Sequence, residues 1–102
     1  MATVRFESAT GSTSARIVVQ GRFDFNISTA FKGAQEKLPK GDPVVVDLTE
    51  ADYVDSSALG LILMLRRRAG DTAAGVRVVA PKAEVRRVLE VAKFDRLVTL
   101  EK

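Results

Sequence analysis

The chain has 102 residues, a formal net charge of +3 and 28% charged residues, and it contains neither cysteine nor histidine. The missing residues exclude disulfides, thiol nucleophiles, imidazole acid–base chemistry and Cys/His metal sites. The length predicts a single domain over residues 1–102. The small net charge does not indicate nucleic-acid binding. The lack of a signal core or long apolar run predicts a cytoplasmic chain without direct membrane insertion.

The N-terminal part of the chain is predicted to form a hairpin. Residues Thr3–Glu7 alternate between apolar and polar with period two, which is typical of a strand with one solvated face. A turn cluster at 10–14 separates this segment from a second apolar run at 15–20.

A helix is predicted to follow the hairpin. Its apolar positions recur at helical spacing and are Ile27, Ala30, Phe31, Ala34 and Leu38. Asn26 or Ser28 is the expected N-cap, because short polar side chains satisfy the first free N–H groups of a helix. The Pro-Lys-Gly-Asp-Pro segment at 39–43 ends the helix.

The central stretch carries most of the chemical information. Residues 44–46 are three consecutive valines, which predict a buried strand, and a polar bend follows them. The apolar run at 58–65 predicts a helix that continues to Arg68. Asp-Ser-Ser at 55–57 comes directly before this run. The loop thus places a carboxylate and two hydroxyls at the positive end of a helix dipole, which favours anions such as phosphate.

The C-terminal part adds a strand, a helix and a final strand. Residues 75–80 predict the first strand, Pro81 opens the helix, and 97–100 predict the last strand. The expected core stripe of this helix consists of Val85, Val88, Leu89 and Ala92. The order of elements predicts an α/β two-layer sandwich with a mixed four- to five-stranded sheet and three or more helices.

Ser56 and Ser57 have three possible roles: helix caps, a phosphorylation site or a hydrolase nucleophile. The hydrolase role is excluded because the chain has no histidine to act as base and no Gly-x-Ser-x-Gly elbow. On local mechanics alone, capping is the favoured role.

Four aspartates follow or flank the predicted strands, at positions Asp24, Asp47, Asp52 and Asp55. They raise the possibility of a magnesium site or of a receiver-like phospho-acceptor at Asp47. The chain is too short for five βα repeats, so turn and cap roles are favoured. No glycine-rich nucleotide loop is present, and we expect neither a metal nor a cofactor.

The central helix is apolar around its whole circumference over Leu59–Leu65. A helix in a two-layer domain turns one face outward, so part of this run is expected to be exposed or covered by a partner. Gly60 costs about 1 kcal/mol of helix propensity relative to alanine, which indicates close approach of another chain or element. The three arginines at 66–68 are expected to form a solvated helix end.

Two motifs resemble the STAS domain of bacterial anti-sigma factor antagonists. The first is Gly-Arg-Phe-Asp at 21–24, similar to the family's Gly-x-Leu/Phe-Asp segment. The second combines Val-Val-Asp-Leu at 45–48 with Tyr-Val-Asp-Ser-Ser-Ala-Leu-Gly at 53–60, similar to the family's Asp-Ser-Ser/Thr-Gly-Leu-Gly. The second motif is the more specific, and Ala58 stands where the family usually has glycine. The resemblance covers essentially the whole chain.

The resemblance implies a partner switch without catalysis. The unphosphorylated protein would bind an anti-sigma factor that is itself a serine kinase, and a cognate phosphatase would reset the phosphorylated form. The implied acceptor is Ser56, supported by Asp55, Ser57 and Asp24. The implied partner interface consists of Ala58, Leu59, Gly60, Ile62 and Leu63.

Two other functions remain open at this point. One is a STAS subunit that docks onto an ABC-type lipid transporter and has no reversible switch. The other is a small enzyme that uses the carboxylates, which the lack of histidine, cysteine and nucleotide motifs disfavours.

Overall fold

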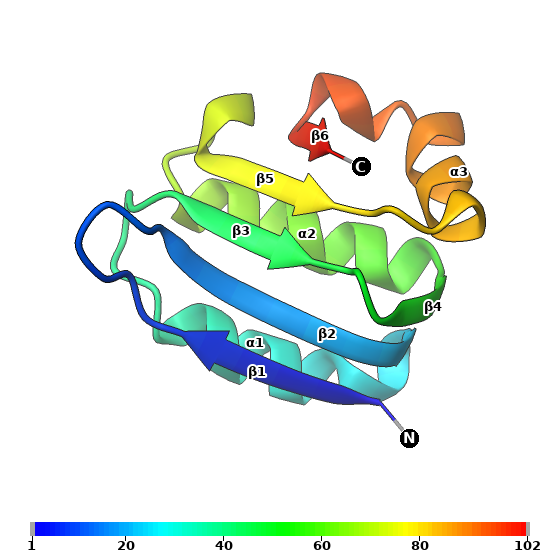
Figure 1. Cartoon of the computed structure of the whole chain (residues 1–102), viewed down its shortest axis with the longest axis horizontal. Helices are drawn as coiled ribbons and strands as arrows, with labels where there is room; N and C mark the ends of the chain where they lie inside the picture. The colour runs from blue at the N-terminus through cyan, green and yellow to red at the C-terminus, as the bar shows by residue number, and fades with distance from the viewer. Residues whose placement is uncertain (1, 102) are drawn as a thin grey trace.

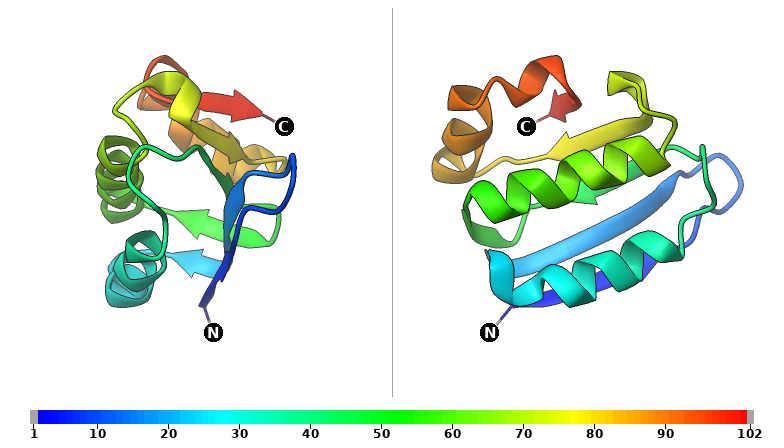
Figure 2. Two further views of the ribbon diagram at one scale, coloured as in Figure 1. Left: turned by 90° about the vertical axis from the view of Figure 1, so that its left-hand side faces the viewer. Right: turned by 180° about the vertical axis from the view of Figure 1, so that it is seen from behind.

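A mixed sheet forms one layer of the molecule, and helices α1 and α2 form the second layer (Figures 1 and 2). The computed structural model describes residues 2–101. The strands are β1 (Thr3–Glu7), β2 (Ala15–Phe23), β3 (Val44–Asp47), β4 (Ala51–Val54), β5 (Val76–Val79) and β6 (Thr99–Glu101). The helices are α1 (Ser28–Glu36), α2 (Ser56–Arg68) and α3 (Ala83–Val91), with 3-10 turns η1 (Phe25–Ile27), η2 (Ala73–Gly75) and η3 (Phe94–Arg96).

The sheet has the strand order β1-β2-β3-β5-β6, and β4 pairs with β2 outside this path. Strand β1 runs antiparallel to β2, from Thr3 opposite Gln20 to Glu7 opposite Arg16, which confirms the predicted hairpin. The pairs β2–β3, β3–β5 and β5–β6 are parallel. The predicted α/β two-layer sandwich with a mixed sheet is therefore confirmed.

Strand β4 replaces the bend that the sequence predicts after β3, so the sheet has six strands. Its segment Ala-Asp-Tyr-Val has two exposed residues between two buried ones, and this pattern lacks the alternation of a half-buried strand. It becomes a strand because it runs parallel to the last residues of β2, with Phe23 opposite Val54.

The face of the sheet that lies under α1 and α2 carries the hydrophobic core. Alternate residues of the strands point to this face, and Phe31 of α1 packs on Phe23 with ring centroids 5.1 Å apart. Ile62 and Leu65 of α2 are also buried here. The strand residues of this core include Ile17, Val19, Val44, Val46, Val76 and Val78.

The opposite face of the sheet is turned toward the viewer in Figure 1, where α1 and α2 lie behind the strands. Charged pairs lie across it: Arg16 Nη1 is 2.7 Å from Asp47 Oδ2, and Arg77 pairs with Glu101 across β5 and β6. The apolar stems of such long side chains shield the remaining apolar groups on this face.

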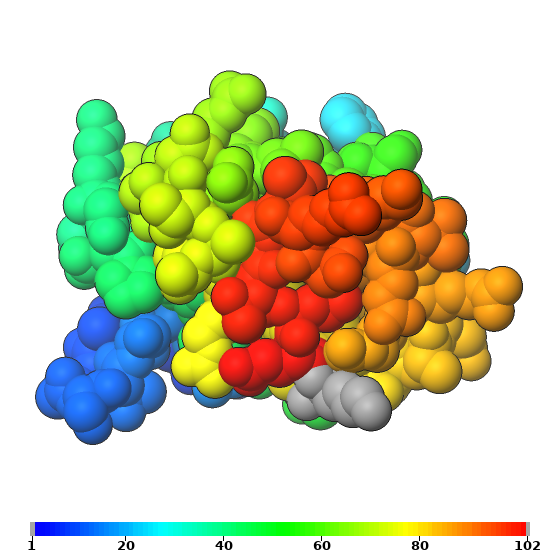
Figure 3. Space-filling view, turned by 90° about the horizontal axis from the view of Figure 1, so that it is seen from above, coloured from blue at the N-terminus to red at the C-terminus, as the bar shows by residue number. Residues whose placement is uncertain are grey.

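The C-terminal segments, coloured orange to red in Figure 3, close one end of the molecule. There α3 packs against β4. Val85 and Leu89 of α3 are buried and Val88 is half-buried, but Ala92 is exposed, so the predicted stripe is one residue too long. The last strand begins at Thr99, two residues later than predicted. Within residues 2–101, none of the helices has the length and apolar character needed to cross a membrane.

Candidate functional site

The parallel pairing of β2 and β4 brings the two sequence motifs together. Phe23 and Val54 are Cα partners, and each is followed directly by an aspartate. Asp24 and Asp55 therefore leave the sheet at the same edge, at about the 5 Å spacing of neighbouring strands. This register places Asp24 beside the Asp-Ser-Ser motif, and its role in supporting a phosphosite stays a prediction.

The two aspartates have almost the same backbone conformation and the same N-capping role. Their φ and ψ angles are −133° and −168° for Asp24 and −132° and −171° for Asp55. Asp24 Oδ1 accepts a hydrogen bond from Asn26 N at 3.0 Å, and Asp55 Oδ1 accepts from Ser57 N and Ala58 N at 3.0 and 3.2 Å. Each carboxylate thus caps the turn that follows it.

The prediction that Asn26 or Ser28 caps the first helix is wrong. The Asp24 cap begins η1, and α1 continues from this 3-10 turn with Ile27 at its N-cap position and no side-chain cap. Because the 3-10 turn η1 leads directly into α1, the first residues of α1 do not need a second polar cap.

The role of Asp55 also corrects the preference for Ser56 and Ser57 as caps. Ser56 is the first residue of α2 and is exposed, and its hydroxyl makes no hydrogen bond within residues 2–101. Ser57 is half-buried and lines a hollow together with Phe25, Ser28 and other residues of α1 and α2. The Ser56 hydroxyl is consequently accessible and is not needed to begin the helix.

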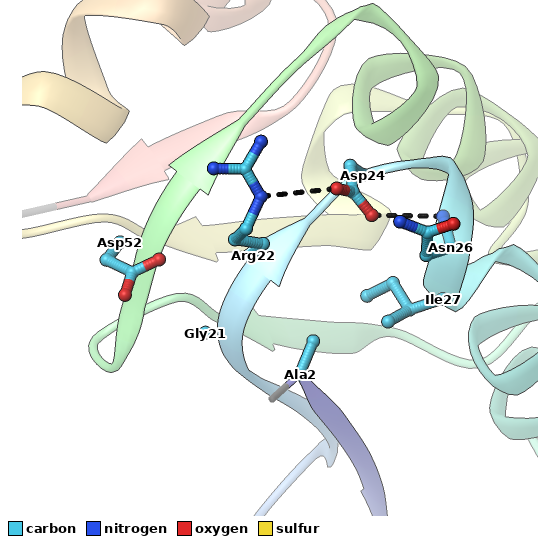
Figure 4. Close-up of a pocket in the computed structure, with 7 residues that line it drawn as sticks. All are labelled: Ala2, Gly21, Arg22, Asp24, Asn26, Ile27 and Asp52. Atoms are coloured by element: carbon cyan, nitrogen blue, oxygen red, sulfur yellow. Dashed lines mark hydrogen bonds and ion pairs between the residues drawn. The ribbon is translucent and has the colours of Figure 1, made fainter.

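The two aspartates differ in their charged neighbours, because Arg22 pairs with Asp24 and not with Asp55. The Nε of Arg22 lies 3.4 Å from Asp24 Oδ2 (Figure 4). Its guanidinium also stacks on the Tyr53 ring, with Cζ 3.9 Å from the ring centroid. Asp55 forms no ion pair within residues 2–101, and its carboxylate beside Ser56 is stabilised instead by two backbone N–H groups at the α2 N-terminus. Asp52 lines the same hollow as Arg22 and Asp24, with Arg22 between the two carboxylates in this view.

Asp47 lies apart from this site, on the open face of the sheet. Partial burial disfavours its charged form, but hydrogen bonds from the Thr49 hydroxyl and backbone N–H, together with the Arg16 guanidinium, hold the pKa of Asp47 below its ordinary value. In the described part of the chain, no three acidic side chains gather closely enough to hold a metal ion.

The structure divides the predicted partner interface into two groups. Ala58 and Ile62 have 0% exposure because they face the sheet one helical turn apart, so their assignment to a contact surface is wrong. Leu59 and Leu63 are half-buried and Gly60 is exposed, so these three remain predicted contacts.

The surroundings of Gly60 and of the three arginines also differ from expectation. A Cβ at Gly60 would meet nothing within 4 Å, so no described element of this chain approaches it. Arg66 pairs with Asp71 at 3.0 Å, and Arg68 donates to the carbonyl oxygens of Leu38 and Glu36 at 2.6 and 3.1 Å. The prediction of a solvated helix end therefore holds only for Arg67, which is exposed.

Sequence reasoning missed the residues that η1 and α1 add to this surface. Phe25 is 72% exposed and Lys32 is exposed, and both line the hollow beside Ser57 and Gly60. The available signal was Phe25 itself, a large apolar residue outside the predicted core stripe of α1. Its meaning depends on how α1 and α2 pack together.

Comparisons with known proteins agree with this fold and with the sequence motifs. Residues 7–99 match a family model described as "Mlab, STAS domain". A STAS-domain containing protein of Pseudomonas aeruginosa (strain UCBPP-PA14) is 40% identical over 100 residues, which cover 95% of this chain and 96% of that protein.

Solved structures with low sequence identity share the fold. An anti-sigma factor antagonist of Mycobacterium paratuberculosis has a TM-score of 0.82 at 21% identity, covering 99% of this chain and 86% of that one. The Bacillus cell fate determinant SpoIIAA in its phosphorylated form has a TM-score of 0.58 at 17% identity, covering 98% of this chain and 92% of that one. The match over 7–99 and the 40% identity show that this chain belongs to the STAS domain family.

Proposed function

We propose that this chain is an anti-sigma factor antagonist that works by partner switching in the cytoplasm. In this proposal the unphosphorylated protein binds and sequesters an anti-sigma factor serine kinase, and phosphorylation of Ser56 releases it. A cognate serine phosphatase restores the binding form. The observation that carries the proposal is the exposed Ser56 hydroxyl at the first residue of α2, beside the Asp55 carboxylate, which has no cationic side-chain partner among residues 2–101.

The position of Ser56 separates the effect of a phosphate on the fold from its effect on binding. A phosphate adds about −1.5 to −2 charge. At a helix N-terminus such a charge is favourable by roughly 0.3–1 kcal/mol, so the fold should persist. In a docked complex the same charge must lose water beside Asp55, and each 1.4 kcal/mol of lost binding energy weakens the complex about tenfold.

Two further observations support the class of function. The structural neighbours named above share the fold at TM-scores of 0.58 to 0.82, and both the mycobacterial protein and SpoIIAA are described as anti-sigma factor antagonists. The chain has no histidine and no cysteine, and Asp24, Asp47 and Asp55 act as caps or ion-pair partners, which supports binding rather than catalysis.

The test compares tagged wild-type protein with Ser56→Ala, Ser56→Asp and a matched control, Ser12→Asp. Ser12 is an exposed serine in the loop of the β1–β2 hairpin. Each bait is incubated in lysate of the native host, and captured proteins are identified by mass spectrometry. We expect wild type, Ser56→Ala and Ser12→Asp to capture a small serine kinase and Ser56→Asp to lose it.

A second readout separates loss of binding from loss of fold. The melting temperature of Ser56→Asp should stay near that of wild type, because the substitution adds a negative charge at the positive end of α2. A large drop in melting temperature would contradict the role of Ser56 as a surface switch. In vitro, the captured kinase with ATP should add one phosphate to wild type and none to Ser56→Ala.

A docking subunit of an ABC-type lipid transporter is the second candidate function. The observation that bears on it is the matching family model, whose description names a STAS domain and no antagonist, and a STAS domain can dock without a switch. In the same capture experiment, this function predicts that all four baits retain the same transporter subunits, because docking would not depend on the charge at Ser56.

A further inference from the structure

A groove follows the seam between α1 and α2 on the surface that faces away from the sheet. The two helices lie side by side there, as the right-hand view of Figure 2 shows. Two hollows line the seam and share Met64. The apolar one adjoins the α2 N-terminus and includes Phe25, Gly60 and Leu61. The basic one includes Lys40, Arg67 and Arg68. We call this continuous surface the seam groove.

The apolar end of the seam groove exposes large side chains that a partner can bury. Phe25 is 72% exposed and Met64 is 42% exposed. Gly60 lines the same hollow, and a Cβ there would meet nothing within 4 Å. The chain thus gives up about 1 kcal/mol of helix stability at Gly60 without any contact of its own that requires glycine. The missing side chain deepens the hollow.

The charges along the seam groove have a single sign. Its lining includes four cations, Lys32, Lys40, Arg67 and Arg68, and no carboxylate. Among residues 2–101, none of these four forms an ion pair, since Arg68 donates only to neutral carbonyl oxygens. The neighbouring Arg66, which does pair with Asp71, is not part of the lining. The groove therefore presents uncompensated positive charge next to an apolar hollow.

We propose that the seam groove binds an acidic amphipathic helix of a partner protein. Apolar side chains of that helix would pack on Phe25, Gly60 and Met64, and its carboxylates would pair with Lys40 and Arg67. The 13 residues of α2 measure about 20 Å, which matches three to four turns of a docked helix. A concave seam between two helices fits a rod-shaped segment, whereas a bilayer surface is flat.

This inference deepens the proposed function by naming the chemistry of the partner segment, and it rests on that function only for the partner's identity. Ser57 lines the apolar end of the groove, and Ser56 precedes it at the start of α2. A phosphate on Ser56 would place negative charge at the mouth of a groove that receives an acidic helix. Repulsion between the two would release the helix while the fold remains intact.

The test begins with selection from a random library of displayed 16-residue peptides on the immobilised wild-type protein. We expect the enriched peptides to carry net negative charge and to repeat apolar residues at helical spacing. The dissociation constant of the best peptide is then measured by fluorescence anisotropy. Raising the salt concentration should weaken its binding, because exposed charges are screened.

Matched variants locate the binding surface. Gly60→Gln fills the hollow and should weaken peptide binding at least tenfold. Gly33→Gln is its control, because Gly33 is an exposed glycine of α1, outside the groove lining, whose added Cβ would also meet nothing within 4 Å. Arg67→Glu should also weaken binding at least tenfold. Arg87→Glu, at an exposed position of α3, should leave it unchanged.

Each alternative outcome contradicts the proposal. Enriched peptides without acidic bias, binding that survives Gly60→Gln, or no enrichment at all would overturn it. Binding to phosphatidylglycerol vesicles that Gly60→Gln and Arg67→Glu abolish, without peptide enrichment, would assign the groove to a membrane surface. The outcome is separable from that of the proposed function: loss of kinase capture by Ser56→Asp tests the switch, whereas peptide selection on unmodified protein tests the groove.

Discussion

The two faces of the sheet are built from the same strands but are held by different forces. The face under α1 and α2 is packed with aliphatic and aromatic side chains, and the open face carries ion pairs such as Arg16–Asp47. Strand β3 contributes to both, since Val46 points to the helices and Val45 to the open face. Their exposed fractions are similar, 0% and 6%. Val46, however, is surrounded by apolar core side chains, whereas Val45 lies on the face that carries the ion pairs.

The comparison shows that burial alone does not measure a residue's contribution to stability. Val46 lies among close-packed core side chains that cannot collapse into a gap. Val45 is outside this core cluster, on the face where long charged side chains lie, and these can shift to fill a lost volume. The predictions below test this contrast, from the largest effect to the smallest.

The first prediction compares Val46→Ala with Val45→Ala in one strand. Val46→Ala removes two methyl groups from the core and should cost about 2–3 kcal/mol of unfolding free energy, including the cavity. Val45→Ala should cost less than about 1 kcal/mol, because its surroundings relax. Urea denaturation followed by circular dichroism measures both. Equal losses would show that the open face is packed as rigidly as the covered one.

The second prediction concerns the attachment of the helix layer to the sheet. Asp55→Ala removes the cap of α2 and should cost about 1 kcal/mol of unfolding free energy. Asp24→Ala should cost less, because it caps only the three residues of η1. Thermal unfolding compares the two variants with Asp52→Ala, an exposed control on β4. A larger loss for Asp24→Ala would contradict this order.

The third prediction concerns the unfolding free energy that glycine costs on the outer surface of the helix layer. Gly60→Ala should raise the unfolding free energy by about 0.5–1 kcal/mol, because alanine restricts the unfolded chain and meets no obstacle in the helix. Gly33→Ala, at an equally open helical position, should show a similar gain. Differential scanning calorimetry measures both. A loss at Gly60 alone would mean that the fold itself requires glycine there.

The fourth prediction concerns how the Arg16–Asp47 pair on the open face changes the free energy of unfolding with pH. Because the pKa of Asp47 is lowered by folding, its contribution is complete above the unfolded pKa of about 3.9 and is lost as the pH falls through the lower folded value. Asp47→Asn should therefore flatten the acid decline of unfolding free energy, by less than about 1 kcal/mol for a partly exposed pair. Urea titrations between pH 2 and 6 compare it with wild type. Parallel acid profiles would mean that the pair is not linked to folding.

The amino-acid sequence by itself determined most of the elements and the position of the candidate site. Period-two and helical spacing are local patterns, so they located the hairpin, the valine strand, the three helices and the strand at 76–79. The Asp-Ser-Ser segment before an apolar run marked the start of α2, and the two motifs together indicated the family.

Only the tertiary structure decided how those local elements meet. Strand β4 exists through its pairing with β2, and the same register sets Asp24 beside Asp55. The helical phase of α2 against the sheet buries Ala58 and Ile62 and leaves Gly60 outward. The seam groove forms where α1 packs on α2. These features depend on contacts between residues far apart in the chain, and no local pattern of residues encodes such contacts.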